Sequence, residues 1–569
     1  MIPKRLWLVQ VAIFCVAGLI SDGLYAQQAP DAGRLLREQP KPPAQTAPRL
    51  KPPAPPQPAA PAADNGPRIL VQGFRVEGAT LFPADQLAAL LKQAVGTERS
   101  FSQLRALGLV LVGYYADQGY LARVVLPEQN IKQGIVTYRV IEGRRGSVRV
   151  DTKGKRLDSA RIERYIARRL APGAPMDLHT LGEALNVLNE QPGIVARSSL
   201  SPGTGEGDID LVVEAVEQTL TSYNLQANNQ GSRATGEWQV GGVATLNNPS
   251  GAFDAASALL NASDGTTFGR LDYNIALGDA GLRLGVNASQ LDYRLTQSNF
   301  SALHGRGTAS NGGATLSYPL LRRNDQNLSL NGSYDAKRLR DETVAGETGN
   351  RRVEVASVGL EGNRQDGLWG GGVNAFGANV YLGEVKQHNA AALAADQLTR
   401  RVEGSYNKLA WYYSRLQIIT NGVNLKTSLR GQFADKNLDS SERFSLGGPT
   451  GVRAYPVGEA LGDEGWLLSF SLAKSLGEGK SASVFVDTGE VTLNRNLWTG
   501  WNAASPQIPN RYRLTGAGLA LAWQLGAHTS LSASVAAPLG NNPGKAPNGN
   551  NYDGSRHRGR AWVSLSTQF

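Results

Sequence analysis

The last ten residues, RAWVSLSTQF (residues 560–569), decide the fold of this chain. Successive side chains of an extended strand point to opposite faces. One face of this segment is therefore apolar and consists of Ala561, Val563, Leu565, Thr567 and Phe569. The other face carries Trp562 and small or polar side chains. A segment of about ten residues with one apolar and one polar face is typical of a transmembrane β-barrel strand.

The same alternation runs back through the second half of the sequence. TSLSASVAA (529–537) and LALAWQL (519–525) repeat it, and we count sixteen such segments between Tyr223 and Phe569. A soluble β-sandwich is the alternative, but sandwiches rarely contain so many strands, whereas a sixteen-stranded barrel encloses a water-filled channel. The pattern therefore predicts an antiparallel transmembrane barrel over residues 219–569. The terminal Phe569 suits an outer-membrane barrel whose last strand is read by the barrel-assembly machinery.

Residues 68–218 have a mixed pattern with two similar halves. Each half reads as a strand, two helices at helical apolar spacing and two further strands. ILVQGFRVEG (69–78) reads as the first strand, and the first helix, from Asp85 to Val95, directs Leu87, Leu90 and Leu91 inward. The sequence thus predicts two tandem α+β units, at 68–145 and 146–218.

The N-terminal region predicts three further segments. Lys4 and Arg5 precede an apolar run that ends before Ala26, which indicates a signal peptide over residues 1–26. DAGRLLREQ (31–39) predicts a short helix capped by Asp31, within a segment at 27–39. Residues 40–67 hold eleven of the 28 prolines, and such a segment extends as polyproline II to roughly 80 Å.

Composition argues against several other classes of protein. The single cysteine, Cys15, lies in the predicted signal peptide, which excludes disulfides and thiolate metal sites from the mature chain. The five histidines are far apart, and no metalloprotease or nucleophile-elbow motif is present. We therefore expect no enzyme, metal or cofactor. The net charge of +10 is scattered rather than clustered, which argues against nucleic-acid binding.

A Gly-rich stretch, LGGPTGVRAYPVGEALGDEG (446–465), raises the question of a nucleotide site. A phosphate loop needs a strand, G-x-x-x-x-G-K-[ST] and a helix, and this stretch has no such lysine. GEGKS (477–481) fails as well, since Lys474 stands at the first glycine position and strand patterns flank it. We interpret GEGKS as a hairpin turn.

Arg453 in the Gly-rich stretch has a candidate partner downstream. In SASVFVDTGEV (481–491), Val484 and Val486 share the lipid-facing side, so Asp487 faces the lumen. An ionised carboxylate there is costly unless it is solvated or paired. A long loop entering the lumen can bring Arg453 to Asp487; alternatively, both side chains are simply solvated.

Two short motifs give a specific resemblance. VRAY (452–455, preceded by Gly451) and FVDTG (485–489) resemble the V-R-G-[YF] and F-x-D-x-G motifs of two-partner secretion transporters, the TpsB class of the BamA-like superfamily. Residues 119–143 and 188–203 resemble parts of that family's two POTRA domains. Ala454 departs from the usual glycine, which constrains the loop backbone. The motif residues are Val452, Arg453, Ala454, Tyr455, Phe485, Asp487 and Gly489.

The resemblance implies an outer-membrane pore that exports one large unfolded β-rich exoprotein, without ATP, from periplasm to cell surface. This TpsA-type partner would be an adhesin, a hemolysin or a contact-dependent toxin. The segment at 27–39 would plug the pore, and Arg453 with Asp487 would lock the pore loop at 440–465. Strand addition suits an unfolded partner, and our candidate edge consists of Arg123, Val124, Val125 and Leu126. Outer-membrane lipid would surround the barrel. The alternative is an outer-membrane protein insertion factor of the BamA/TamA kind; a porin for small solutes has no use for two periplasmic domains.

Overall fold

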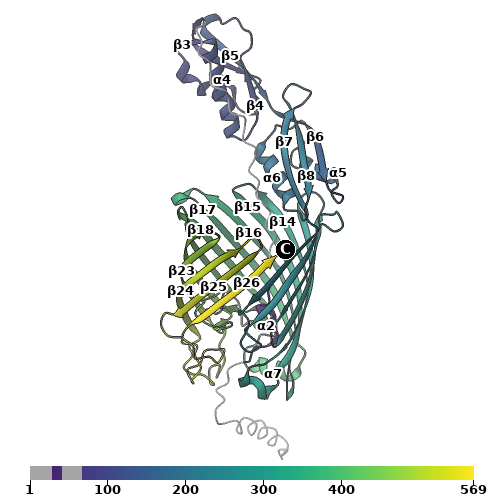
Figure 1. Cartoon of the computed structure of the whole chain (residues 1–569), viewed down its shortest axis with the longest axis vertical. Helices are drawn as coiled ribbons and strands as arrows, with labels where there is room; N and C mark the ends of the chain where they lie inside the picture. The colour runs from purple at the N-terminus through teal and green to yellow at the C-terminus, as the bar shows by residue number, and fades with distance from the viewer. Residues whose placement is uncertain (1–28, 41–66) are drawn as a thin grey trace, which may run out of the picture.

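The computed structural model describes residues 29–40 and 67–569. The predicted signal peptide and nearly all of the proline-rich segment lie outside the described residues. Figure 1 shows two α+β units, stacked end to end, above one side of a large barrel. We call the end of the barrel next to these units the near end, and the opposite end the far end.

Sixteen strands close the barrel, as predicted, and each is antiparallel to its neighbours. The last strand pairs with the first through Ser564–Gln568 and Asn224–Asn228. The barrel strands are β9 (Thr221–Asn228), β10 (Gln239–Asn247), β11 (Ala255–Ala262), β12 (Thr266–Leu277), β13 (Leu282–Arg294), β14 (Arg306–Arg322), β15 (Gln326–Thr343), β16 (Gly346–Asp366), β17 (Gly372–Gln387), β18 (Gly404–Thr420), β19 (Val423–Ala434), β22 (Glu464–Gly477), β23 (Lys480–Thr492), β24 (Arg511–Leu525), β25 (Thr529–Pro538) and β26 (Arg560–Gln568).

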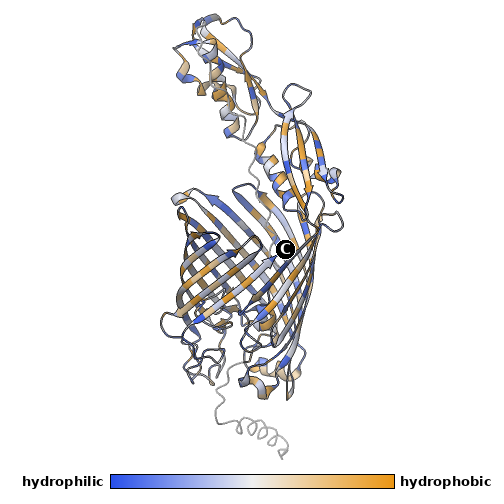
Figure 2. Cartoon of the chain, viewed as in Figure 1, coloured by the Kyte–Doolittle hydropathy of each residue, from blue (hydrophilic) through white to orange (hydrophobic). Residues whose placement is uncertain are grey.

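Alternation along these strands separates an apolar outer face from the lumen (Figure 2). Leu260 and Leu271 face outward and are 68% and 64% exposed. Val484 and Val486 are exposed, whereas Phe485 and Asp487 between them are buried, as the period of two requires. The GEGKS segment connects β22 to β23 in antiparallel register, so it is the hairpin turn that the sequence indicates.

Helices outside the α+β units are short. Among the residues that the structure describes, no helix has the length and apolar character needed to cross a membrane. Helix α7 (Ala390–Leu398) lies in the connection between β17 and β18, and single 3-10 turns occur at Ser298–Leu303, Leu368–Gly370 and Ser440–Glu442.

The first α+β unit consists of β1 (Arg68–Leu70), β2 (Gly73–Glu77), α3 (Ala84–Leu90), a 3-10 turn at Lys92–Ala94, β3 (Glu98–Ser100), α4 (Phe101–Asp117), β4 (Ala122–Val125), a 3-10 turn at Lys132–Gly134 and β5 (Ile135–Glu142). The single strand expected at 69–78 is two strands, because β1 pairs with β3 and β2 pairs with β5. The expected inward position of Leu90 is also wrong. Leu90 is 38% exposed at the helix end, while Leu87 and Leu91 fill the core.

The second unit repeats this order with β6 (Arg144–Lys153), α5 (Ser159–Ala167), α6 (Leu178–Asn189), β7 (Ile194–Pro202) and β8 (Asp208–Glu217). Its sheet order, β6-β8-β7, matches the order β2-β5-β4 of the first unit. In both sheets the first and last strands are parallel, and the fourth element of the repeat is an edge strand. Strand β8 leads into β9, the first barrel strand.

Helix α2 (Ala32–Glu38) lies inside the barrel (Figure 1). Asp31 caps it, as predicted, by accepting a hydrogen bond from Arg34 N at 2.9 Å. Seven residues are too few for an isolated helix in water, so its contacts with the lumen must stabilise it.

Candidate functional site: a barrel lumen filled by a loop and a helix

The connection between the eleventh and twelfth barrel strands, residues 435–463, folds back into the lumen. We call it the lumen loop. Two short strands, β20 (Phe444–Ser445) and β21 (Leu461–Gly462), pair at its base. Backbone bonds continue inward to the bond between Gly448 N and Tyr455 O (3.1 Å). At the turn, a Cβ on Gly451 would lie 1.9 Å from Leu446 O, so this position requires glycine.

Arg453, at the tip of the lumen loop, binds Asp487 on β23. Its Nε and Nη2 atoms donate to the two carboxylate oxygens, both at 2.8 Å, and its backbone N donates to Oδ2 at 3.1 Å. Ser469 on β22 donates its hydroxyl to Oδ1 at 2.6 Å. Asp487 is 1% exposed, so it is a paired carboxylate and not a solvated one. The structure thus brings these two predicted residues together.

Aromatic side chains surround the arginine. The Phe485 ring centroid lies 3.3 Å from the Arg453 guanidinium carbon, within the range of a cation–π contact. Trp562 on the last strand donates its indole N–H to Arg453 O at 2.8 Å. Tyr455 is buried and donates its hydroxyl to Thr515 O at 3.4 Å. The loop tip therefore contacts strands far apart in sequence.

Small residues allow the loop to lie against the wall. A Cβ on Gly489 would lie 2.6 Å from Leu446 Cδ2, and a Cβ on Gly516 would lie 2.5 Å from Ala454 Cβ. Val452 is fully buried in this contact. Ala454 is not among the residues with positive φ, so alanine causes no backbone strain there. Gly516 provides the space for its methyl group.

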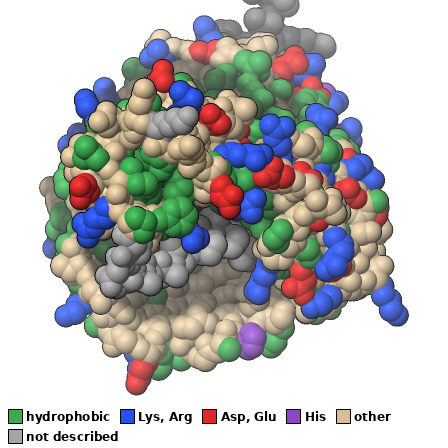
Figure 3. Space-filling model, turned by 90° about the horizontal axis from the view of Figure 1, so that it is seen from above, with side chains coloured by type: hydrophobic (Ala, Val, Ile, Leu, Met, Phe, Trp, Pro, Cys, Tyr) green, Lys and Arg blue, Asp and Glu red, His purple; other side chains and the backbone are tan. Residues whose placement is uncertain are grey.

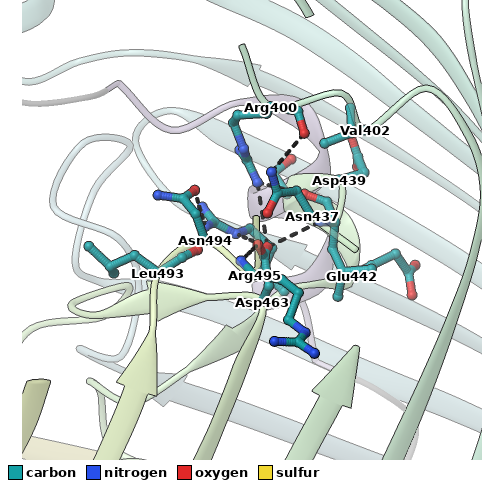
Figure 4. Close-up of polar contacts among 12 residues, drawn as sticks. Arg400, Val402, Asn437, Asp439, Glu442, Asp463, Leu493, Asn494 and Arg495 are labelled. Atoms are coloured by element: carbon teal, nitrogen blue, oxygen red, sulfur yellow. Dashed lines mark hydrogen bonds and ion pairs between the residues drawn. The ribbon is translucent and has the colours of Figure 1, made fainter. Parts of the chain in front are cut away.

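The base of the loop is fixed to neighbouring connections at the far end (Figure 4). Asp463 is fully buried and accepts hydrogen bonds from Arg443 Nε and Arg495 N, both at 2.9 Å. Arg400, from the connection between β17 and β18, lies 3.6 Å from the same carboxylate. Asn437 donates to Arg400 O at 2.7 Å. Three connections, the lumen loop and those between β17 and β18 and between β23 and β24, therefore meet at one buried carboxylate.

A second buried carboxylate, Glu442, binds the loop to the barrel wall. Lys408 on β18 lies 2.6 Å from its Oε2, and Lys337 on β15 contacts its Oε1. Glu442 is 4% exposed. Because a buried carboxylate is costly without partners, these two lysines define where the loop can rest.

Arg351, on β16, connects the wall, the lumen loop and helix α2. Its guanidinium contacts Asp341 of β15 at 2.9 Å, Asp439 of the loop at 2.5 Å and Asp31 of the helix at 2.8 Å. Ser440 donates to both Asp31 oxygens at 2.7 and 2.8 Å. One arginine cannot neutralise three carboxylates, so repulsion among them offsets part of the attraction.

Helix α2 also buries apolar surface. Ala32 and Leu35 are 0% and 1% exposed. Arg34 donates to Val457 O in the loop at 3.1 Å and lies 4.3 Å from the Tyr552 ring centroid. The buried apolar cluster around the helix consists of Leu259, Phe268, Leu291, Tyr293, Ala309, Leu339, Val353, Val355, Val385, Val402, Tyr406, Ala434 and Leu438.

Between these contacts and the near end, part of the lumen wall is small and uncharged. Strands β25 and β26 present inward-facing Ser530, Ser532, Ser534, Ser564 and Ser566. Figure 3, viewed from the near end, shows a hollow walled mainly by uncharged polar side chains and backbone. Such a wall offers hydrogen bonds without strong charge or large apolar contacts.

The remaining predicted residues lie outside the lumen. Arg123, Val124 and Val125 belong to β4, an edge strand, but Leu126 lies beyond the end of β4, so its place in the candidate strand is wrong. The pairing with β5 ends at Val125, and Pro127, which has no backbone N–H to donate, follows two residues later. Phe569 is 66% exposed, and its backbone exchanges hydrogen bonds with Tyr223 at 2.9 and 3.1 Å.

Several residues of the site were missed from the sequence. Arg351, Glu442 and Asp463 are buried and charged. Arg351 lies at an inward position of β16, whereas Glu442 and Asp463 belong to the lumen loop. A charged residue at an inward position of a barrel strand is a possible sign of a buried ion pair. Many inward charged residues are only solvated, however, so this sign does not single out the buried ones. The sequence predicts strand β7, which is longer than β4, but indicates no role for it. Among residues 29–40 and 67–569, no group of three or more His, Cys, Asp or Glu side chains is placed to hold a metal ion.

A barrel of sixteen strands whose lumen holds a loop and a helix, with two α+β units at one mouth, is an architecture of outer-membrane proteins, and the family match identifies the class. The family model for haemolysin secretion/activation protein ShlB/FhaC/HecB matches residues 207–518, and the ShlB-type POTRA domain matches residues 69–143. The chain belongs to this ShlB/FhaC/HecB family. It is a two-partner secretion transporter of the outer membrane, and its two α+β units, POTRA 1 and POTRA 2, lie in the periplasm.

Individual relatives agree with this assignment. The chain is 29% identical over 476 residues to heme/hemopexin transporter protein HuxB of Haemophilus influenzae (strain 86-028NP), covering 80% of this chain and 81% of that protein. It is 25% identical to hemolysin transporter protein ShlB of Serratia marcescens, covering 79% and 80%. Because the POTRA units lie in the periplasm, the near end of the barrel is periplasmic and the far end is extracellular.

Solved structures share the fold. CdiB from Escherichia coli aligns with a TM-score of 0.67 at 21% identity, over 90% of this chain and 93% of that one. BamA from Haemophilus ducreyi lacking POTRA domains 1–3 aligns with a TM-score of 0.51 at 16% identity, over 88% and 100%. BamA therefore shares the barrel architecture, and the family match favours the transporter.

Proposed function

We propose that the described arrangement is the resting state of an export channel for one large secreted exoprotein, and that helix α2 must leave the lumen during export. The observation that carries this proposal is the position of α2. It lies inside the barrel and binds the loop and the wall through Asp31, Arg351 and Ser440. An extended chain cannot share that space with the helix.

The contacts of helix α2 are strong enough to hold it in the pore at rest and weak enough to let it leave. Leu35 contributes apolar burial, while Asp31, Asp341 and Asp439 compete for Arg351. Like charges at one site disfavour each other. Departure of α2 removes one of the three carboxylates, which leaves Asp341 and Asp439 as the partners of Arg351.

Arg453 and Asp487 have the role of positioning the tip of the lumen loop. At about 4 Å and an effective dielectric constant near 20, the attraction is about 4 kcal/mol before desolvation. Arg453 is 18% exposed at its side chain, so water weakens the net contribution. The bidentate geometry fixes the tip in one place, and the closed strand ladder maintains the barrel.

The periplasmic edge strands are the proposed sites of partner recognition. Strand β4, with Arg123, Val124 and Val125, is one edge of the POTRA 1 sheet, and β7 is one edge of the POTRA 2 sheet; β2 and β6 are the other edges. An unfolded partner can add a strand to either edge through main-chain hydrogen bonds. Strand β7 has nine residues and β4 has four, so β7 offers the longer template.

Folding of the partner at the cell surface would bias its passage without ATP. A partner variant that stays unfolded outside should therefore leave the cell more slowly. Export of such a variant at the full rate would contradict this source of energy.

We assign the partner to the adhesin, hemolysin or contact-dependent toxin kind. Phe569 remains the proposed signal to the assembly machinery.

A reversible crosslink tests the departure of the helix. A Cβ on Gly33 would lie 2.6 Å from Ser440 Oγ, close to the separation of about 3 Å between a Cβ and the far sulfur of a disulfide. Oxidation of the Gly33→Cys/Ser440→Cys variant should block export, and a reductant should restore it. Each single variant is the control. Full export by the oxidised pair, with the disulfide verified by mass spectrometry, would show that α2 can stay in place.

A further inference from the structure

The apolar core of POTRA 2 includes two side chains of the barrel, Ala276 of β12 and the much larger Phe253. Phe253, in the periplasmic connection between β10 and β11, is fully buried. Its ring belongs to the apolar cluster of POTRA 2, together with Ile162, Ile166 and Val187. The Tyr165 ring meets it edge to face, with centroids 5.6 Å apart and an interplanar angle of 77°. A barrel residue thus completes the POTRA 2 core.

The connection that carries Phe253 has an unusual backbone. Asn248 and Phe253 have φ values of 53° and 57°, in the left-handed region that large side chains rarely adopt. Asn248 Oδ1 accepts the N–H of Phe253 at 2.7 Å, and Asn248 N donates to Asp254 O at 2.6 Å. Such a conformation persists when surrounding contacts enforce it. Here the enforced conformation directs the ring into POTRA 2.

Polar contacts surround the ring on the POTRA 2 side. The Arg161 guanidinium carbon of α5 lies 4.9 Å from the Phe253 ring centroid, and Arg161 donates to Ala276 O at 3.3 Å. Arg283 of β13 donates both to Phe253 O at 3.2 Å and to Gln191 Oε1 of POTRA 2 at 2.6 Å. The ring therefore lies within a set of contacts that cross the domain boundary.

Two further periplasmic connections contact POTRA 2. Arg169, just after the end of α5, donates to Ala280 O at 2.9 Å, between β12 and β13. Asn186 of α6 donates to Asn324 Oδ1 at 3.0 Å, between β14 and β15. Glu190 lies 2.7 Å from Arg322 Nε. The three contacted connections are successive along one side of the barrel rim.

We propose that Phe253 is a positioning residue that joins POTRA 2 and the barrel into one rigid body. A single covalent connection, from β8 to β9, would allow POTRA 2 to swing, and relative motion is the default for domains joined by a linker. A second attachment through a buried ring removes that freedom. Strand β7 then stays at a fixed place beside the pore mouth. The inference concerns the placement of POTRA 2 and holds whichever edge strand binds the partner.

Distance measurements between spin labels test the proposal in the full-length protein. The only cysteine of the chain, Cys15, lies in the predicted signal peptide. Labels can therefore be placed at Ser199→Cys in POTRA 2 and at His528→Cys in the periplasmic turn between β24 and β25. We expect one narrow distance distribution, its loss in Phe253→Ala and its retention in Phe253→Leu. Phe300→Ala is the matched control, because Phe300 is a buried phenylalanine in an extracellular 3-10 turn. An unchanged distribution in Phe253→Ala would overturn the proposal.

Export provides a second readout that separates position from folding. Phe253→Ala should lower export while the amount of closed barrel in the outer membrane is unchanged. A thiol crosslink between Asn186→Cys and Asn324→Cys, added to Phe253→Ala, should restore export because it reattaches POTRA 2 at a neighbouring contact. No recovery in a verified crosslinked protein with a narrow distance distribution would show that Phe253 does not act by positioning POTRA 2.

Discussion

Replacing Leu35 by alanine should move helix α2 from its docked to its undocked state without opening the barrel wall. Leu35 is 1% exposed and lies in the apolar cluster of the lumen. Truncating a buried leucine costs about 2–5 kcal/mol, and water can enter the space left in a wet lumen, so we take about 2–3 kcal/mol. With tenfold for each 1.4 kcal/mol, the ratio of undocked to docked helix should rise by roughly 30- to 140-fold.

Conductance of single channels in planar bilayers measures this ratio as the fraction of time in a high-conductance state. Arg37→Ala is the matched control on the same helix, because Arg37 is partly exposed. We expect the high-conductance fraction to rise for Leu35→Ala and to change little for Arg37→Ala. Equal rises would show that truncating any side chain of α2 undocks it, so the buried apolar surface of Leu35 would not be the specific cause. An unchanged open fraction for Leu35→Ala, together with a large one when residues 27–39 are deleted, would refute apolar docking as the restraint.

Three further predictions concern the lumen loop and POTRA 1. Asp487→Asn should leave Arg453 without its charged partner, at a cost of about 3 kcal/mol or less in a partly wet site. Limited proteolysis of the folded barrel should then cut the lumen loop faster. Unchanged cleavage would contradict the role of the Arg453–Asp487 pair in holding the loop tip. Gly516→Ala should clash with Ala454, whose Cβ lies 2.5 Å from the added methyl group, and lower export; Ala454→Gly in the same chain should restore it, and failure to do so would locate the clash elsewhere. Burial disfavours the charged form of Glu142, but hydrogen bonds from Thr80, Leu81 and Tyr115 outweigh this and lower its pKa. A lowered carboxyl pKa contributes stability above the unfolded-state value of about 4.3 and loses it as pH falls below that value. The melting temperature of POTRA 1, measured by calorimetry, should therefore fall below about pH 4.3. Glu142→Gln should remove most of this pH dependence. An unchanged pH profile in Glu142→Gln would show that other groups cause it.

Much of the architecture could be predicted because it depends on local periodicity. Alternation along RAWVSLSTQF and its repeats gave the strand number, and the Asp487 strand is the thirteenth of the barrel. Side-chain direction in a strand has a fixed period of two, so the inward position of Asp487 also followed from the sequence. The pairing with Arg453 was one of two open possibilities, because nothing local states where a loop of 29 residues will fold.

The contacts that hold α2 in place could not be predicted for the same reason. Arg351 joins carboxylates at positions 31, 341 and 439, which no pattern in the sequence relates. The role of Phe253 was hidden as well, since a single phenylalanine in a short connection between two strands does not reveal that a second domain receives it. The end of β4 before Leu126 and the exposure of Leu90 are boundary effects, which tertiary contacts decide.

The most direct test of the central claim is a quantitative comparison of secreted and outer-membrane proteins. Mass spectrometry would be applied to the culture medium and the outer membrane of cells with this protein intact, deleted or carrying Arg453→Ala. A dedicated transporter predicts that one very large protein disappears from the medium on deletion, while other outer-membrane proteins are unchanged. Broad loss of other barrels would instead indicate an insertion factor, and no change in either fraction would contradict protein export.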